Sequence, residues 1–233
     1  ERIEPRVVDD RVFHPVAASE QVYYASSSDD QVYCLDAATG AIVWRFFADA
    51  PVRYAPTVAG DSILFGSDDG FVYSVSGRDG SLHWRRRVGP IDRRIPGNGR
   101  LISIWPIRSS VLVQDGVAYC FAGLFPSQGV FAAAYHVSDG AVVYQRQIDQ
   151  SPQGYVLSAA GELYVPTGRS NPIAVDPKTG SVLRSFDGVG GTFALVVDNE
   201  LVAGPGNNGS LAVSHRTSRA SLAPYNTDAD IDA

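Results

Sequence analysis

Short runs of alternating apolar and polar residues cover most of this 233-residue chain. Between residues 55 and 85 four such runs follow one another, separated by Gly, Asp, Ser and Pro. Alternation with a period of two, rich in Val, Ile, Tyr and Phe, is typical of strands joined by hairpins. No stretch keeps the apolar period of a helix for about ten residues. The pattern therefore predicts an all-β fold with very little helix.

The pattern returns along the chain as an internal repeat. Its copies lie at residues 32–44, 72–84, 134–144 and 174–184. Each copy holds one glycine at the corresponding place, namely Gly40, Gly80, Gly140 and Gly180. These glycines are 40, 60 and 40 residues apart, so one repeat carries an insertion of about 20 residues. Four strands in a repeat of about 40 residues are typical of one blade of a β-propeller.

The chain is accordingly predicted to be a β-propeller of four-stranded antiparallel blades. The blades are expected at residues 12–46, 55–87, 100–147, 152–186 and 192–224, with an inserted loop at 87–105. The fifth copy is eroded from Gly209 onward, and the chain begins at Glu1 and contains no Met. We therefore expect about five blades belonging to a larger, seven- or eight-bladed propeller.

Paired acidic residues stand before corresponding strands in the first two repeats, at Asp29-Asp30 and Asp68-Asp69. Asp can bond to its own backbone in a tight turn, and the glycine at Gly70 supplies a positive φ. The same carboxylates could be calcium ligands, but calcium needs six or more converging oxygens. Hairpin turns are the favoured interpretation.

Composition excludes several classes of function. A net charge of −6 disfavours nucleic-acid binding, because phosphate contacts require a surplus of Lys and Arg. No apolar run reaches the roughly 20 residues that span a bilayer. The two cysteines, Cys34 and Cys120, lie in separate apolar runs and are predicted to be buried free thiols. The four histidines show no metal-binding spacing, so no metal site is predicted.

The repeat unit Ala-x-Asp-x-x-Thr-Gly-x-x-x-Trp resembles the tryptophan-docking motif of pyrroloquinoline-quinone (PQQ) type propellers. Trp44 and Trp84 occupy its last position, Tyr144 is a soft replacement there, and Arg184 departs from it. The resemblance covers roughly residues 12 to 215 and implies that each Trp packs on the next blade. In style the chain is most similar to PQQ-like domains of large secreted planctomycete-type bacterial proteins.

The resemblance leaves two classes of function open. PQQ-dependent alcohol or sugar dehydrogenases of this fold usually show an adjacent cysteine pair, a calcium site and a catalytic Asp, and bind PQQ with calcium. Here the cysteines are far apart in sequence, and no residue aligns with the catalytic Asp. No catalytic residue is therefore predicted, and a cofactor is expected only under this alternative.

Arginines gather around the insertion. Eight of the nineteen basic residues lie between residues 78 and 108: Arg78, Arg85, Arg86, Arg87, Arg93, Arg94, Arg100 and Arg108. Loops on a rigid scaffold often carry binding sites, and Arg forks suit carboxylates, phosphates or sulfated sugars. Arg93, Arg94, Trp105 and Arg108 are the candidate binding patch. The alternative is that these arginines form surface ion pairs with acidic groups of neighbouring blades.

Together these features predict a non-catalytic binding or scaffold module of a larger extracytoplasmic bacterial protein. The expected partner is a protein or an anionic glycan or ligand at one face of the propeller, and further domains of the same polypeptide are expected. The alternative is the PQQ-dependent dehydrogenase.

Overall fold

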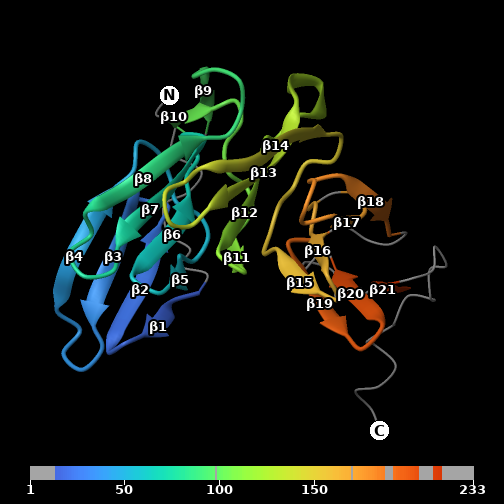
Figure 1. The fold of residues 1–233 in the computed structure, drawn as a ribbon. Coiled ribbons are helices and arrows are strands. Elements are labelled where there is room, and N and C mark those ends of the chain that lie inside the picture. Colours follow the sequence, from blue (N-terminus) through green and yellow to red (C-terminus); the bar gives the residue numbers. More distant parts are fainter. Residues whose placement is uncertain (1–13, 98, 169, 187–190, 205–211, 217–233) are drawn as a thin grey trace, which may run out of the picture.

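The computed structural model is built almost entirely of antiparallel sheets (Figure 1). It describes residues 14–97, 99–168, 170–186, 191–204 and 212–216. Within these residues the only helix is a single 3-10 turn, Pro126–Gln128. Four sheets have four strands in chain order, which confirms the predicted all-β, propeller-type fold.

The sheets stand side by side in the order of the chain (Figure 1). Blade 1 holds β1 (Val16–Ala18), β2 (Gln21–Ser26), β3 (Gln31–Asp36) and β4 (Ile42–Phe47). Blade 2 holds β5 (Thr57–Ala59), β6 (Ser62–Gly66), β7 (Phe71–Ser76) and β8 (Leu82–Arg87). Blade 3 holds β11 (Leu112–Gln114), β12 (Val117–Ala122), β13 (Val130–His136) and β14 (Val142–Ile148).

Blade 4 holds β15 (Leu157–Ala159), β16 (Glu162–Val165), β17 (Ile173–Val175) and β18 (Val182–Ser185). Blade 5 shows three strands among the described residues: β19 (Phe193–Val197), β20 (Glu200–Gly204) and β21 (Ala212–His215). The predicted fifth blade extended to residue 224, and its residues 205–211 and 217–224 lie outside the described part. So do residues 12–13 of the predicted first blade.

The insertion differs from the irregular loop expected at 87–105. It forms a separate hairpin of β9 (Arg94–Gly97) and β10 (Arg100–Ser103). β10 pairs with β9 and not with blade 3, so the start of the predicted third blade belongs to the insertion and the sheet itself begins at Leu112. Along β10, Arg100 and Leu101 are exposed and Ile102 and Ser103 are buried, so the strand enters the core at its C-terminal end.

The hydrophobic core lies between successive blades rather than at one centre. Side chains of blades 1 and 2 form one cluster, and similar clusters join blades 2 and 3, blades 3 and 4, and blades 4 and 5. Each sheet therefore buries apolar side chains against its neighbours, as a stacked repeat requires. Cys34 and Cys120 are buried free thiols in the first and second of these clusters.

Corresponding corners give each blade its docking surface. Gly40, Gly80, Gly140 and Gly180 all have φ near +70°, and each backbone N–H donates to the carbonyl four residues earlier. Immediately before each corner the pairing of the third and fourth strands shifts register. A backbone with positive φ beside a bulge is strained for residues other than glycine. The spacing of these glycines therefore fixes where each blade turns.

Three of these corners, those of blades 2, 3 and 4, each receive an aromatic side chain from the preceding blade. The Trp44 indole N–H donates to the Gly77 carbonyl over 2.9 Å, and its ring lies over Gly80. Trp84 repeats this arrangement with the Val137 carbonyl, at 2.8 Å, and Gly140. Tyr144 packs on Gly180 in the same way. At the next blade the position is taken by Arg184, which instead forms an ion pair with Glu162 of its own sheet.

Alanine at these corners should separate backbone strain from blade docking. A Cβ at Gly140 would lie 2.7 Å from the Trp84 ring, whereas a Cβ at Gly40 would meet nothing within 4 Å. We expect Gly40→Ala to lower the free energy of unfolding by about 1 kcal/mol through φ strain alone. Gly140→Ala should lower it by a further 1–3 kcal/mol or so, because it crowds the docked indole. Urea unfolding of the two variants measures the difference, and equal losses would contradict the docking contact.

Candidate functional site

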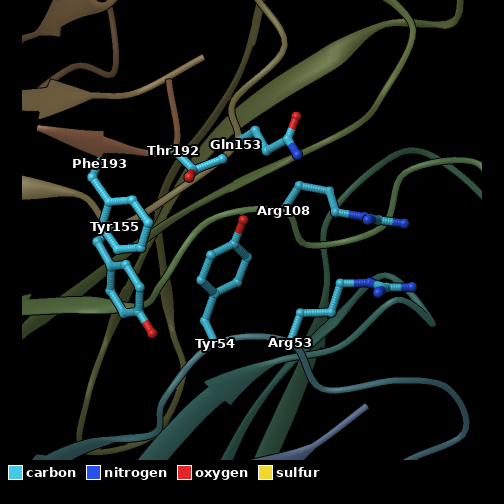
Figure 2. Close-up of a pocket in the computed structure, with 7 residues that line it drawn as sticks. All are labelled: Arg53, Tyr54, Arg108, Gln153, Tyr155, Thr192 and Phe193. Carbon is cyan, nitrogen blue, oxygen red and sulfur yellow. The ribbon is translucent and has the colours of Figure 1, made fainter. Parts of the chain in front are cut away.

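The segments that lead into the first strands of the blades meet around a small cavity (Figure 2). β5 approaches both β1 and β11, and β15 approaches β19, so these first strands face one another. The cavity has a volume of about 140 Å³. Its lining comes from four such segments and consists of Arg53, Tyr54, Arg108, Gln153, Tyr155, Thr192 and Phe193.

Three of these side chains occupy equivalent places in the repeat. Arg53, Arg108 and Gln153 each stand four residues before the first strand of a blade. Both arginines end a Pro-x-Arg tripeptide, at residues 51–53 and 106–108. The repeat therefore delivers one polar side chain per blade to a shared position.

The two arginines converge on one carboxylate. Arg53 Nε donates to Asp68 Oδ2 over 2.7 Å, and Arg108 contacts both Asp68 oxygens, with Nε 3.1 Å from Oδ1 and Nη2 3.2 Å from Oδ2. The Asp68 side chain is 0% exposed, while those of Arg53 and Arg108 are 21% and 13% exposed. The Asp68 carboxylate thus holds both guanidinium groups in place. In Figure 2 the side chains of Arg53 and Arg108 extend in parallel.

Burial and charge act against each other in this triad. Burial raises the pKa of the Asp68 carboxyl, and Arg108 and Arg53 oppose that rise. Burial likewise lowers the pKa of the Arg108 guanidinium, and Asp68 opposes that fall. Each charge is kept in a poorly hydrated place by its partner, so removal of one partner leaves the other uncompensated.

Aromatic rings form the other wall of the cavity. The Tyr155 ring meets Tyr54 edge-on at 5.3 Å and stacks on Phe193 at 5.9 Å. His14 Nδ1 lies 3.0 Å from the Tyr155 hydroxyl. Burial raises the pKa of Tyr54 to about 12, so its phenol stays neutral at physiological pH. The cavity therefore pairs a cationic wall with a neutral aromatic wall.

A second, larger cavity of about 490 Å³ lies beside the first. It is bordered by the loop around Pro126–Gln128, by the segment between blades 3 and 4, and by residues near Thr167. Gln153 lines both cavities, so they are neighbours across this side chain. Leu124, Phe125, Pro126 and Pro152 form the apolar part of the second cavity's lining, and Phe125 is 50% exposed. The rest of the lining is polar and includes Asp149 and Thr167.

The four residues of the predicted patch occupy different settings. Arg93 and Arg94 are exposed on or beside the inserted hairpin. Trp105 is only 5% exposed, since its indole N–H donates to the Gln128 carbonyl over 2.8 Å and its ring packs on Gly89 and Phe131. It therefore presents no open face to a flat ligand. Arg108 lines the smaller cavity.

Other arginines of the insertion hold the hairpin against blade 1. Arg100 is ion-paired with Asp30 and also donates to the Ser28 carbonyl. Arg94 lies 3.5 Å from both Asp49 and Asp92. Ion pairing with neighbouring acids, the alternative considered for this cluster, thus describes Arg94 and Arg100. Among the described residues no ion-pair partner of Arg93 is found.

Substitutions in the exposed arginines should have small effects on folding. Arg94→Ala removes two long ion pairs in which Asp49 and Asp92 are about half exposed. We expect a loss of about 0–1 kcal/mol for Arg94→Ala, and less for Arg93→Ala, because solvent screens exposed pairs. Thermal unfolding at low and high salt measures both. A loss well above this range for Arg93→Ala would contradict an exposed, unpaired position for that side chain.

Most residues of the cavity were not predicted from the sequence. Asp68 was predicted as a turn residue, and the turn is present, but its carboxylate also anchors two arginines. Tyr54, Tyr155, Thr192 and Phe193 belong to no sequence motif. The recurring Pro-x-Arg at the start of two blades is the signal that could have indicated Arg53 together with Arg108.

Comparisons with known proteins agree with this architecture. The family model described as outer membrane protein assembly factor BamB matches residues 6–102. A protein of that name from Yersinia pestis is 26% identical over 184 residues, which are 77% of this chain and 44% of the relative. The chain thus spans less than half the length of this curated relative.

Solved structures show the same fold at low identity. A quinohemoprotein alcohol dehydrogenase from Comamonas testosteroni matches 91% of this chain and 42% of its own, with a TM-score of 0.70 and 14% identity. BamB from Moraxella catarrhalis matches 89% of this chain and 73% of its own, with a TM-score of 0.51 and 13% identity. Together with the repeat, the docked aromatic corners and the stacked sheets, these matches support assignment of the chain to the PQQ-like repeats and show a β-propeller fold.

Proposed function

We propose that this chain is a non-catalytic, protein-binding module of an extracytoplasmic bacterial protein, and that it binds through the face that carries the two cavities. The observation that carries the proposal is the pair of arginines fixed by a buried carboxylate at the wall of a cavity. Guanidinium groups that are already ordered lose little entropy on binding, which favours recognition of an anionic group.

The relatives support the class of function. The curated relative is named an outer membrane protein assembly factor, which associates this repeat with protein assembly outside the cytoplasm. Within the described residues no helix has the length and apolarity needed to cross a membrane. Glycans and further domains of the same polypeptide remain part of the proposal as partners, supported by the anion-binding chemistry of arginine.

The proposal includes function without PQQ and calcium, and several features support it. Cys34 and Cys120 are buried in different blades, so they form no adjacent pair. No group of three or more His, Cys, Asp or Glu side chains within the described ranges could hold a metal. These residues do not fit the cofactor, and no catalytic step is derived from it.

Site-specific photo-crosslinking in the cell of origin tests the proposal. A benzophenone side chain placed at Phe125, on the rim of the larger cavity, should crosslink to another protein. The matched control is Val143, which is 40% exposed on the fourth strand of the same blade. Crosslinks at Phe125 and none at Val143 are expected. Absence of protein crosslinks from Phe125 would contradict a protein-binding role for this face.

A further inference from the structure

The charges around the smaller cavity do not balance. Arg53 and Arg108 share the single carboxylate of Asp68. Asp30 is also within electrostatic reach of Arg53, but it is ion-paired with Arg100. The triad of Arg53, Asp68 and Arg108 therefore carries one net positive charge beside the cavity, in a protein whose net charge is −6.

The two guanidinium groups retain donors for a further acceptor. A guanidinium has five N–H bonds. Within the described part of the chain, Arg53 donates to Asp68 only through Nε and Arg108 only through Nη2, while Arg108 Nε lies 3.1 Å from Asp68 Oδ1 without forming a hydrogen bond. The Arg53 side chain is 21% exposed, so it is not fully buried and a ligand can approach its remaining N–H groups. One more carboxylate would both accept these bonds and neutralise the excess charge.

The size of the cavity limits what this anion can be. About 140 Å³ holds a side chain rather than a cofactor or a sugar chain. A single excess charge matches a monoanionic carboxylate better than a dianionic phosphate. The neutral wall of Tyr54, Tyr155 and Phe193 suits the methylene groups that carry such a carboxylate.

The neighbouring cavity provides room for the rest of the ligand. It is larger, at about 490 Å³, is lined in part by Leu124, Phe125 and Pro126, and shares Gln153 with the arginine site. An amide at the shared wall can donate and accept, which suits a peptide backbone that passes over it. An apolar side chain next to the carboxylate would cover Phe125, half of which is exposed.

We propose that the two cavities form one site for an extended peptide segment of the partner protein. A carboxylate of this segment sits on Arg53 and Arg108, and an apolar side chain sits on Leu124, Phe125 and Pro126. The proposal rests on the proposed protein-binding function and specifies its ligand. The carboxylate comes from an internal Asp or Glu or from a chain terminus, since both present the same group to the arginines.

Fluorescence anisotropy with designed peptides tests the site on the whole chain. The probes are fluorescein-labelled Gly-Ser decapeptides with one Leu and one Glu, one to four residues apart, and an amidated C-terminus. A second set replaces Glu by Gln, and a third set keeps Gln but has a free C-terminal carboxylate. At least one spacing of the first or third set should bind about tenfold or more tightly than its uncharged counterpart. Added salt should weaken this binding.

Two variants assign the binding to the two cavities. Arg53→Gln should weaken the carboxylate peptides about tenfold, while Arg146→Gln, an exposed arginine of β14, changes the net charge equally and should leave binding unchanged. Phe125→Ser should weaken the same peptides about fivefold, and replacing Leu by Ser in the peptide should do likewise.

The outcomes separate this proposal from the proposed function. Equal affinity for the Glu, Gln and free-terminus sets would overturn it, even if Phe125 crosslinks to a protein in the cell. Equal effects of Arg53→Gln and Arg146→Gln would also overturn it. If Arg53→Gln reduces folding, the comparison of peptide sets on the unaltered protein still decides. Preference for the first or the third set identifies the source of the carboxylate.

Discussion

Replacing Trp84 by alanine is expected to lower the free energy of unfolding by about 3–5 kcal/mol, as for other buried large aromatic side chains. The indole lies between blades 2 and 3, where its N–H donates to the Val137 carbonyl and its ring covers Gly140. Its removal opens a cavity at a joint between sheets, and blades further along the chain depend on that joint. Urea unfolding monitored by circular dichroism measures the loss.

Two control variants separate the effect of the ring contact from that of the hydrogen bond and from a general effect of substitution. Trp84→Phe keeps most of the ring contact and loses the hydrogen bond, so it should cost about 1–2 kcal/mol. Val142→Ala, on the exposed side of β14, should change stability by about 0.5 kcal/mol or less. A loss for Trp84→Ala no larger than that for Val142→Ala would show that the blades do not depend on the docked indole.

Replacing Arg108 by glutamine should destabilise the protein by about 3 kcal/mol at neutral pH. Asp68 is completely buried and would keep only Arg53 as an ion partner. Arg146→Gln removes the same charge from an exposed strand and should change stability by about 0.5 kcal/mol or less. Denaturant unfolding of the two variants at the same pH gives the comparison.

The loss in Arg108→Gln should also depend on pH. Arg108 opposes the rise that burial imposes on the pKa of Asp68, so its removal raises that pKa further. A carboxyl whose pKa is raised on folding binds more protons in the folded state, so stability falls as the pH rises through that range. The deficit of Arg108→Gln should therefore shrink as the pH falls from neutral toward the ordinary pKa of a carboxyl group.

A double variant checks the cause of this pH dependence. Asp68→Asn together with Arg108→Gln removes the buried negative charge. It should recover part of the lost stability, and its remaining deficit should vary little with pH. A deficit of Arg108→Gln that grows toward low pH would contradict the assignment to Asp68.

The repeat made much of the fold predictable. Gly40, Gly80, Gly140 and Gly180 recur because each blade turns at a residue of positive φ, and this local requirement can be read from sequence. The strands follow from alternation of period two for the same reason. Local conformation and repetition together thus indicated the all-β blades.

The binding site was harder to predict because its parts are brought together by the arrangement of blades. Asp68 has the sequence of a turn, and nothing nearby in sequence indicates that Arg53 and Arg108 reach it. Trp105 was expected to be available to a ligand, but an insertion can supply core as well as surface, and its ring fills the space over Gly89. Contacts between distant segments carry no local periodicity, so only the recurring Pro-x-Arg hinted at this site.

The central claim, that this PQQ-like propeller binds without catalysing, is tested most directly by titrating PQQ into the purified protein with excess calcium. Quinone absorbance and dye reduction with a panel of alcohols and sugars are followed together. We predict no saturable absorbance shift and no turnover, because Cys34 and Cys120 lie in different blades and the described residues offer no cluster of metal ligands. A stoichiometric, saturable shift accompanied by substrate-dependent dye reduction would contradict the account.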